Sequence, residues 1–194
     1  RELLAKLTAT DVSTAAFPFM SIGEMDLGMY PALVGRLTFT GDLGYEIWMK
    51  PEYQAQIFDL LMQAGEEFGL KLFGSRALNS LRLEKGFGGW ATEYRPVYGP
   101  FEAGLGRFID LGKNDFIGRE AAAREKADGP ERRLVTFTID ADDADVLGDE
   151  PIWHGEDVVG WITSGGFSHH VDQSVALGYI PVGLADGSDG FEIE

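Results

Sequence analysis

The stretch RLTFTGDLGYEIWMK, residues 36–50, decides the fold of the first part of this 194-residue chain. Its middle, residues 40–44, holds two glycines and an aspartate, which tolerate the left-handed backbone that a hairpin turn requires. The alternating residues before this turn, and those that follow it at 45–49, are typical of two paired strands. The stretch therefore predicts an antiparallel hairpin within a sheet.

The return strand of the hairpin divides its side chains between two faces. Because side chains alternate along a strand, Glu46 and Trp48 share one face, whereas Tyr45 lies on the other, where we expect it to pack. The helix predicted further along the chain presents Arg76 and Arg82. An acid and a base on rigid elements around an aromatic ring indicate a pocket for a flat, nitrogen-rich ligand.

The two arginines cannot serve one ligand together. They are six residues apart, which separates them by about 240° around a helix. We therefore expect Arg76 to be the companion of Glu46, with a surface ion pair on the helix as the alternative. Arg82 is expected to have a structural role and to pair with Glu84 or Glu102.

The elements around the hairpin predict an α+β domain. Apolar residues at helical spacing indicate the helices, and Pro51 suits a first helical turn. Helices are expected at residues 1–8, 51–69, from 74 or 75 onward, at 101–105 and up to about 128; further strands are expected at residues 21–28, 30–41 and 70–73.

The Asp-Gly-Pro at residues 128–130 is the predicted domain boundary. It separates an α+β domain of residues 1–129 from a second domain of residues 130–194. In the second domain, short apolar runs between Gly and Asp turns predict strands, and their close spacing favours a small antiparallel β-barrel. The final FEIE predicts a strand whose partner is missing, and the opening at Arg1, in mid-helix, indicates a fragment.

The net charge of −16 is unevenly distributed. Residues 1–127 carry 17 acids and 14 bases, whereas residues 128–194 carry 15 acids and 2 bases, which supports a change of domain. This charge argues against a nucleic-acid partner, since phosphate contacts need clustered Lys and Arg. The acids of the second part are expected to form a solvated surface, with cation binding as the alternative.

Composition also bears on whether the protein is a membrane protein, a disulfide-bonded protein or a metal-binding protein. With 44% hydrophobic residues the chain has ample material for a core, but no apolar run is long enough for a transmembrane helix, so no membrane partner is expected. The absence of cysteine excludes disulfides and fits a reducing compartment, and we expect a cytoplasmic location. His169 and His170 face opposite sides of a strand, so no metal site is expected.

Four motifs appear in order along the chain. They are RLTFTGDLGYEIWM from residue 36, SRALNSLRLEKGF from 75, YGPFEAGLGRFIDLGKNDFIGREA from 98 and SGGFSHHVDQSVALGYIPV from 164. Together they resemble the glycine cleavage T-protein (aminomethyltransferase) family and its relatives, the tetrahydrofolate-binding C-terminal parts of dimethylglycine and sarcosine dehydrogenases. EKGFGGWATEYRP, from residue 84, is more similar to the flavoenzyme-fused branch.

The resemblance implies a fold, a cofactor and site residues. The fold is a ferredoxin-like, T-protein-type α+β domain followed by a small antiparallel β-barrel, and the cofactor is tetrahydrofolate. Glu46 matches the family's pterin-binding glutamate, since a carboxylate can accept two parallel N–H bonds; the alternative is a strand glutamate that faces water. Arg76 matches the folate-contacting arginine. Trp48 is the third candidate folate-binding residue and would flank the pterin, although a core role is favoured for it.

The resemblance also implies an activity. In the intact enzyme a one-carbon unit from an N-methyl amine, of the dimethylglycine or sarcosine type, passes to tetrahydrofolate. The family's catalytic aspartate is expected to precede Arg1, so no catalytic residue is assigned here, and FAD is expected only if an upstream flavoprotein domain exists. The loop at residues 93–95 is expected to border the folate channel. The alternatives are a free aminomethyltransferase fragment, a demethylase of the same fold, and a non-catalytic folate-binding or scaffold module.

Overall fold

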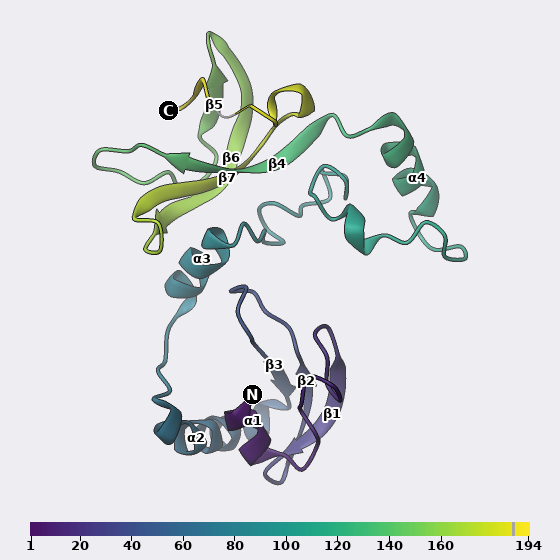
Figure 1. The fold of residues 1–194 in the computed structure, drawn as a ribbon, viewed down its shortest axis with the longest axis vertical. Coiled ribbons are helices and arrows are strands. Elements are labelled where there is room, and N and C mark those ends of the chain that lie inside the picture. Colours follow the sequence, from purple (N-terminus) through teal and green to yellow (C-terminus); the bar gives the residue numbers. More distant parts are fainter. Residues whose placement is uncertain (188) are drawn as a thin grey trace. The chain divides into compact units, whose positions relative to one another are not determined.

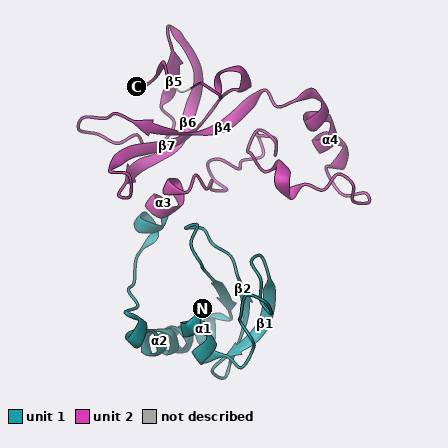
Figure 2. Ribbon diagram, viewed as in Figure 1, with its two compact units in different colours: residues 1–78 teal, residues 79–194 magenta. Residues whose placement is uncertain are grey.

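The computed structural model describes residues 1–187 and 189–194 of the chain (Figure 1). The chain forms two compact units, residues 1–78 and residues 79–194 (Figure 2). Each unit has a sheet of its own. Among the described residues, none of the helices combines the length and the apolar character that a membrane crossing requires.

The first unit is a three-stranded antiparallel sheet with helices on one face. Its strands are β1 (Ile22–Leu27), β2 (Tyr30–Gly35) and β3 (Glu46–Met49), adjacent in that order. Its helical elements are α1 (Glu2–Leu7), the 3-10 turn η1 (Pro51–Tyr53), α2 (Gln54–Gly65) and the 3-10 turn η2 (Glu66–Phe68). The predicted hairpin is confirmed, although its connection runs from residue 36 to residue 45.

Alternation along the strands places one face of this sheet in the core. Met25 of β1 and Val34 of β2 are buried in one cluster with Leu4 of α1 and Ile57 of α2. Full burial of a side chain such as that of Ile57 contributes about 1.5–3 kcal/mol. Tyr45 packs against the same cluster, which confirms its expected place. The helices thus cover one face and leave the opposite face of the sheet open.

The second unit is a five-stranded antiparallel sheet preceded by helices and irregular segments. Its strands are β4 (Arg132–Ile139), β5 (Pro151–His154), β6 (Asp157–Ser168), β7 (Gln173–Pro181) and β8 (Phe191–Ile193), in the order β4-β7-β6-β5-β8. Its helical elements are most of α3 (Ser75–Glu84), η3 (Gly106–Phe108), α4 (Arg119–Asp128) and η4 (Val182–Leu184). The strands predicted after residue 130 are confirmed.

The five strands curl so that the two outermost strands approach each other. The rings of Phe137 on β4 and Phe191 on β8 meet edge to face, with centroids 5.6 Å apart. Ile152 and Ile162 are fully buried in the cluster against which these two phenylalanine rings pack. The sheet is therefore a half-barrel whose open side is filled by side chains, in agreement with the predicted barrel.

The second half of α3 packs with the half-barrel. Leu83, only 1% exposed, clusters with Val175 and Leu177 of β7. This packing explains why the compact units divide at residue 78. The domain boundary expected at residue 129 stays a prediction.

Four expectations about elements are wrong. His169 and His170 lie in the turn between β6 and β7 and not on a strand. Residues 70–73 form no strand: Leu72 and Phe73 are exposed, and no strand of the described chain pairs with them. Residues 101–105 form turns, because Gly104 adopts a left-handed φ of 70° that ends any helix. The C-terminal strand does have a partner, since β8 pairs with β5.

Candidate functional site

Glu46 and Trp48 lie together on the open face of the three-stranded sheet, as the alternation predicts. Both side chains are exposed, Trp48 by 42%, whereas Ile47 between them packs toward the core. The core role considered for Trp48 is therefore wrong. The open face of the sheet therefore carries both a hydrogen-bond acceptor, Glu46, and an aromatic ring, Trp48.

Gly35 allows the indole of Trp48 to lie close to the sheet. Gly35 is directly opposite Glu46 in the β2–β3 ladder, and Trp48 is opposite Leu33, one row further along the same face. A Cβ on Gly35 would come within 2.9 Å of a ring carbon of Trp48. The indole thus covers Gly35, the position directly across from Glu46 on the open face.

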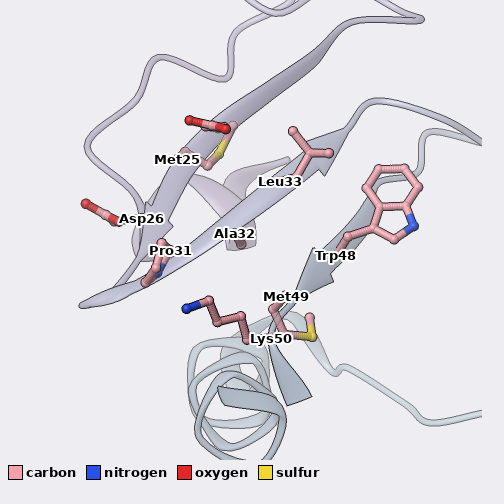
Figure 3. Close-up of a pocket in the computed structure, with 9 residues that line it drawn as sticks. Met25, Asp26, Pro31, Ala32, Leu33, Trp48, Met49 and Lys50 are labelled. Carbon is pink, nitrogen blue, oxygen red and sulfur yellow. The ribbon is translucent and has the colours of Figure 1, made fainter. Parts of the chain in front are cut away.

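A groove of about 630 Å³ extends from Trp48 across the same sheet (Figure 3). Figure 3 shows that side chains of all three strands, and of Lys50 directly after β3, line this groove. Its lining is mainly apolar, with two acids and one base: Met25, Pro31, Ala32, Leu33, Trp48 and Met49, with Glu24, Asp26 and Lys50. A concave, mainly apolar surface with few polar groups is typical of a small-molecule site.

The connection between β2 and β3 holds buried polar atoms with spare hydrogen-bonding capacity. Arg36 Nη1 donates to the carbonyl of Phe17 at 2.8 Å. Its Nε, the hydroxyl of Thr38 and the hydroxyl of Tyr45 are buried, and no hydrogen bond to them forms within the described part of the chain. Water or a polar ligand group can satisfy such atoms. They adjoin the strand that carries Glu46.

No interaction among the described residues brings Arg76 to Glu46. Arg76 is exposed on the first turn of α3, and its guanidinium forms no ion pair in the part of the chain that the structure describes. Its role as a companion of Glu46 stays a prediction. Arg82, in contrast, is 5% exposed and pairs with Glu93, with Nη1 and Oε2 3.1 Å apart. The structural role of Arg82 is confirmed, but its expected partners are wrong.

Those expected partners, Glu84 and Glu102, serve other residues. Glu84 accepts hydrogen bonds from the hydroxyl of Ser168 at 3.0 Å and the backbone N of His170 at 3.1 Å. Burial raises the pKa of Glu84, but these hydrogen bonds outweigh it and leave the pKa below its ordinary value. Glu102 lies 3.6 Å from the guanidinium of Arg132. Among residues 1–187 and 189–194, no three acidic or histidine side chains are placed to hold a metal ion.

Glu93 is the centre of a buried polar cluster in the second unit. Its side chain is fully buried. Five donors surround its carboxylate: Arg82 Nη1 at 3.1 Å, Gly89 N at 2.7 Å, Thr92 Oγ1 at 2.5 Å, Thr163 Oγ1 at 2.5 Å and the hydroxyl of Ser164. Burial raises the pKa of Glu93, but the hydrogen bonds outweigh it and hold the pKa below its ordinary value. Glu93 is therefore a charged, saturated structural acid.

An aromatic stack adjoins this cluster. Tyr179 donates its hydroxyl to the carbonyl of Glu93 at 2.8 Å, and its ring stacks on Tyr98 with centroids 3.8 Å apart. Trp161 Nε1 donates to the hydroxyl of Tyr98 at 2.8 Å. Burial raises the pKa of the Tyr179 phenol far above its ordinary value, so it stays neutral. The whole arrangement fixes the loop that carries Glu93 to the half-barrel.

Comparison with known proteins decides the family. Residues 1–113 match the GCVT N-terminal domain, and residues 132–194 match the glycine cleavage T-protein C-terminal barrel domain. The chain belongs to the glycine cleavage T-protein family. Its T-protein-type fold is shown by the crystal structure of glycine cleavage system aminomethyltransferase T from Bartonella henselae, which matches with a TM-score of 0.84 at 24% identity, over 100% of this chain and 52% of that one.

Within the T-protein family, three curated relatives resemble this chain along nearly all of its length. It is 40% identical to mitochondrial dimethylglycine dehydrogenase of Mus musculus, covering 100% of this chain and 22% of that protein. It is 35% identical to mitochondrial sarcosine dehydrogenase of Homo sapiens, and the match covers 93% of this chain and 20% of that protein. It is 36% identical to an aminomethyltransferase of Symbiobacterium thermophilum, and the match covers 100% of this chain and 51% of that protein. The chain thus spans about a fifth of the dehydrogenases and half of the aminomethyltransferase.

Proposed function

We propose that the open face of the three-stranded sheet binds the pterin of tetrahydrofolate. Glu46 would accept two N–H bonds from the 2-amino group and the ring nitrogen, and Trp48 would flank the ring. The observation that carries this proposal is that Glu46 and Trp48 share the open face of the sheet, with the indole lying over Gly35, directly across from Glu46. Arg76 is proposed as a further folate contact.

The pterin site would serve one-carbon transfer in the whole protein. The dehydrogenase relatives favour an N-methyl amine of the dimethylglycine or sarcosine type as donor and tetrahydrofolate as acceptor. The contribution of this chain is positioning, which holds the acceptor so that the reacting carbon and nitrogen meet in the right geometry. FAD, which would supply the oxidation, is proposed only for a whole protein that has an upstream flavoprotein domain.

A free aminomethyltransferase is the second candidate, because the bacterial aminomethyltransferase relative shares 36% identity over the whole chain. Activity assays on the protein expressed from the complete coding sequence distinguish these two candidate functions. Formation of 5,10-methylenetetrahydrofolate from dimethylglycine or sarcosine supports the first candidate, and dependence on the glycine cleavage partners supports the second. Folate binding without either activity indicates a binding module. The cytoplasmic location stays a prediction, and the dehydrogenase relatives are mitochondrial.

Titration of the 194-residue chain with tetrahydrofolate, followed by tryptophan fluorescence, tests the pterin site directly. We expect saturable quenching, and a loss of about 1–3 kcal/mol in binding free energy for Glu46→Gln because one charged hydrogen-bonding group is removed. Glu52→Gln, an exposed glutamate on η1, is the control and should bind normally. Equal affinity of Glu46→Gln and the parent chain would contradict the assignment.

A further inference from the structure

The register of the three-stranded sheet places Ile22 of β1 in one row with Glu46. Ile22 is directly opposite Gly35 in the β1–β2 ladder, and Gly35 is directly opposite Glu46 in the β2–β3 ladder. Residues in such a row share one face of a sheet, and alternation puts Ile22 on the face opposite to that of Met25, which lies in the core. Since neighbouring strands are about 4.8 Å apart, Ile22 and Glu46 are separated by about 10 Å of open face.

Ile22 is an aliphatic side chain that the described chain leaves uncovered. It is 55% exposed, whereas Met25 and Leu27, the apolar side chains on the other face of β1, are buried. A single exposed apolar side chain is ordinary by itself. Ile22, however, belongs to a row whose middle position, Gly35, is covered by the indole of Trp48. The row therefore offers an acceptor at one end, an aromatic ring in the middle and an aliphatic group at the other end.

The segment that leads into Ile22 is fixed to the residue that follows Gly35. The N–H of Met20 donates to the carbonyl of Arg36 at 3.0 Å, and the N–H of Arg36 donates to the carbonyl of Ser21 at 2.8 Å. Met20 adopts a left-handed φ of 70°, which is uncommon for a residue other than glycine. Such a conformation persists only where the surrounding structure enforces it. These bonds hold the start of β1, and Ile22 with it, in one place beside the row.

The two halves of a reduced pterin differ in the same way as the two ends of this row. The pyrimidine half carries the 2-amino group and the ring N–H, which a carboxylate accepts. In tetrahydrofolate the other half is a reduced ring whose C6 and C7 are saturated, so its edge consists of aliphatic C–H groups. Removal of aliphatic surface from water is favourable, so this edge binds better against an aliphatic side chain than in solvent.

We propose that Ile22 is a further contact of the pterin site and holds the reduced half of the ring, an inference that rests on the function proposed above. The pterin stacks on the indole of Trp48, with its pyrimidine edge at Glu46 and its C7 methylene against Ile22. Ile22 excludes water from this edge and fixes the rotation of the ring on the indole. N5, which neighbours C6 in the reduced half, is thereby held in one position for carbon transfer. Ile22 binds and orients the ring and takes part in no proton transfer.

Titration of the 194-residue chain with tetrahydrofolate and with 6-methyltetrahydropterin, which lacks the aminobenzoyl-glutamate tail, tests this contact. We expect Ile22→Ala to weaken the binding of both ligands about fivefold, because the lost contact is to the ring that they share. Ile22→Leu keeps the aliphatic volume and should bind both ligands within about twofold of the parent chain. Ile117→Ala, at an exposed isoleucine of the other unit, is the matched control and should bind like the parent chain. Urea denaturation midpoints should be unchanged in all three variants, since both side chains are exposed.

Glu46→Gln, titrated in parallel, separates failure of this contact from failure of the pterin site. Unchanged affinity of Ile22→Ala, together with weakened binding by Glu46→Gln, would overturn the role of Ile22 and leave the pterin site standing. Absence of binding by the parent chain, or unchanged affinity of Glu46→Gln, would overturn both. A loss for tetrahydrofolate alone would contradict a contact to the ring. Nuclear Overhauser effects from the Cδ1 methyl group of Ile22 to the C7 protons of bound 6-methyltetrahydropterin would establish the contact directly, and their absence in the saturated complex would refute it.

Discussion

Gly35 is the residue on which the proposed pterin site depends most directly, because the Trp48 indole lies over it, directly across from Glu46. In Gly35→Ala the new Cβ would come within 2.9 Å of the indole and push it off this position. We expect tetrahydrofolate affinity to fall about tenfold or more, with a stability loss of about 1–3 kcal/mol from overpacking. Fluorescence titration and urea denaturation measure the two effects separately.

Gly183→Ala is the control for this substitution, since a Cβ at Gly183 meets no atom within 4 Å. It should leave both affinity and stability near those of the parent chain. If Gly35→Ala binds tetrahydrofolate normally, the position of the indole has no part in recognition, and Glu46 would have to act without an aromatic neighbour.

Glu93 has the largest predicted effect of any single acid on stability. Glu93→Gln leaves the Arg82 guanidinium buried without its counter-charge, and loss of one partner from a buried ion pair costs about 3–5 kcal/mol. Asp186→Asn, which breaks the exposed pair with Arg133, should cost less than about 1 kcal/mol. Urea denaturation of both variants gives the comparison, and similar losses would contradict the structural role of Glu93.

The pH dependence of stability identifies the charge of Glu93 as the cause. Because folding lowers its pKa, its contribution is fully present above the unfolded value of about 4.3 and is lost as the pH falls through the lower folded value. The stability difference between the parent chain and Glu93→Gln should therefore be constant from about pH 6 to 8 and shrink below about pH 4. A difference that does not change with pH would mean that shape, and not charge, is lost.

The sequence predicts that Glu46 and Trp48 share one face of their strand, but it does not predict the burial of Glu93, for a physical reason. Alternation along one strand fixes which side chains share a face, so four residues suffice for that inference. Glu93 depends on Thr163 and Ser164, which are 70 and 71 residues away and meet it only after the half-barrel has formed. A glutamate inside a glycine-rich segment is the available local signal, and it specifies neither burial nor partners.

Helix α3 is the element whose packing explains the second unit. Leu83 is almost fully buried with Val175 and Leu177, and Ser80 donates its hydroxyl to the carbonyl of Phe167 at 3.0 Å. Leu83→Ala should destabilise this unit by about 2–5 kcal/mol, since it removes buried methyl groups and leaves a cavity. Hydrogen exchange should accelerate in α3 and β7 and stay unchanged in β1 and β2.

Leu72→Ala provides the comparison for this element, because Leu72 is 66% exposed and lies in the segment wrongly expected to be a strand. It should change the free energy of unfolding by less than about 0.5 kcal/mol.

The exposure of this segment also explains why the strand prediction was wrong. Apolar residues at 70–73 satisfy the local pattern of a strand, but a strand also requires a neighbour to pair with, and the described chain supplies none there. In the 36–50 hairpin the pairing strand is supplied by the next segment of the sequence, so there the local pattern and the pairing agree.

The charge of the whole molecule is concentrated in one unit. Residues 79–194 carry 22 acids and 10 bases, a net charge of −12, whereas residues 1–78 carry 10 acids and 6 bases, a net charge of −4. The two bases after residue 128 are already engaged: Arg132 lies near Glu102, and Arg133 is bonded to Asp186. The remaining acids of the half-barrel therefore repel one another when salt is low.

This imbalance predicts that salt stabilises the two units unequally. Raising sodium chloride from about 10 mM to about 300 mM shortens the screening length from ~30 Å to less than ~10 Å, so the repulsion within the half-barrel falls. Opening free energies from hydrogen exchange should rise by several tenths of a kcal/mol in β6 and β7, and by much less in β1 and β2. Sucrose at the same osmolality controls for effects other than screening and should act on both units alike. Equal stabilisation of the two sheets by salt would show that the acids are spaced widely enough not to interact, and that their number reflects solubility alone.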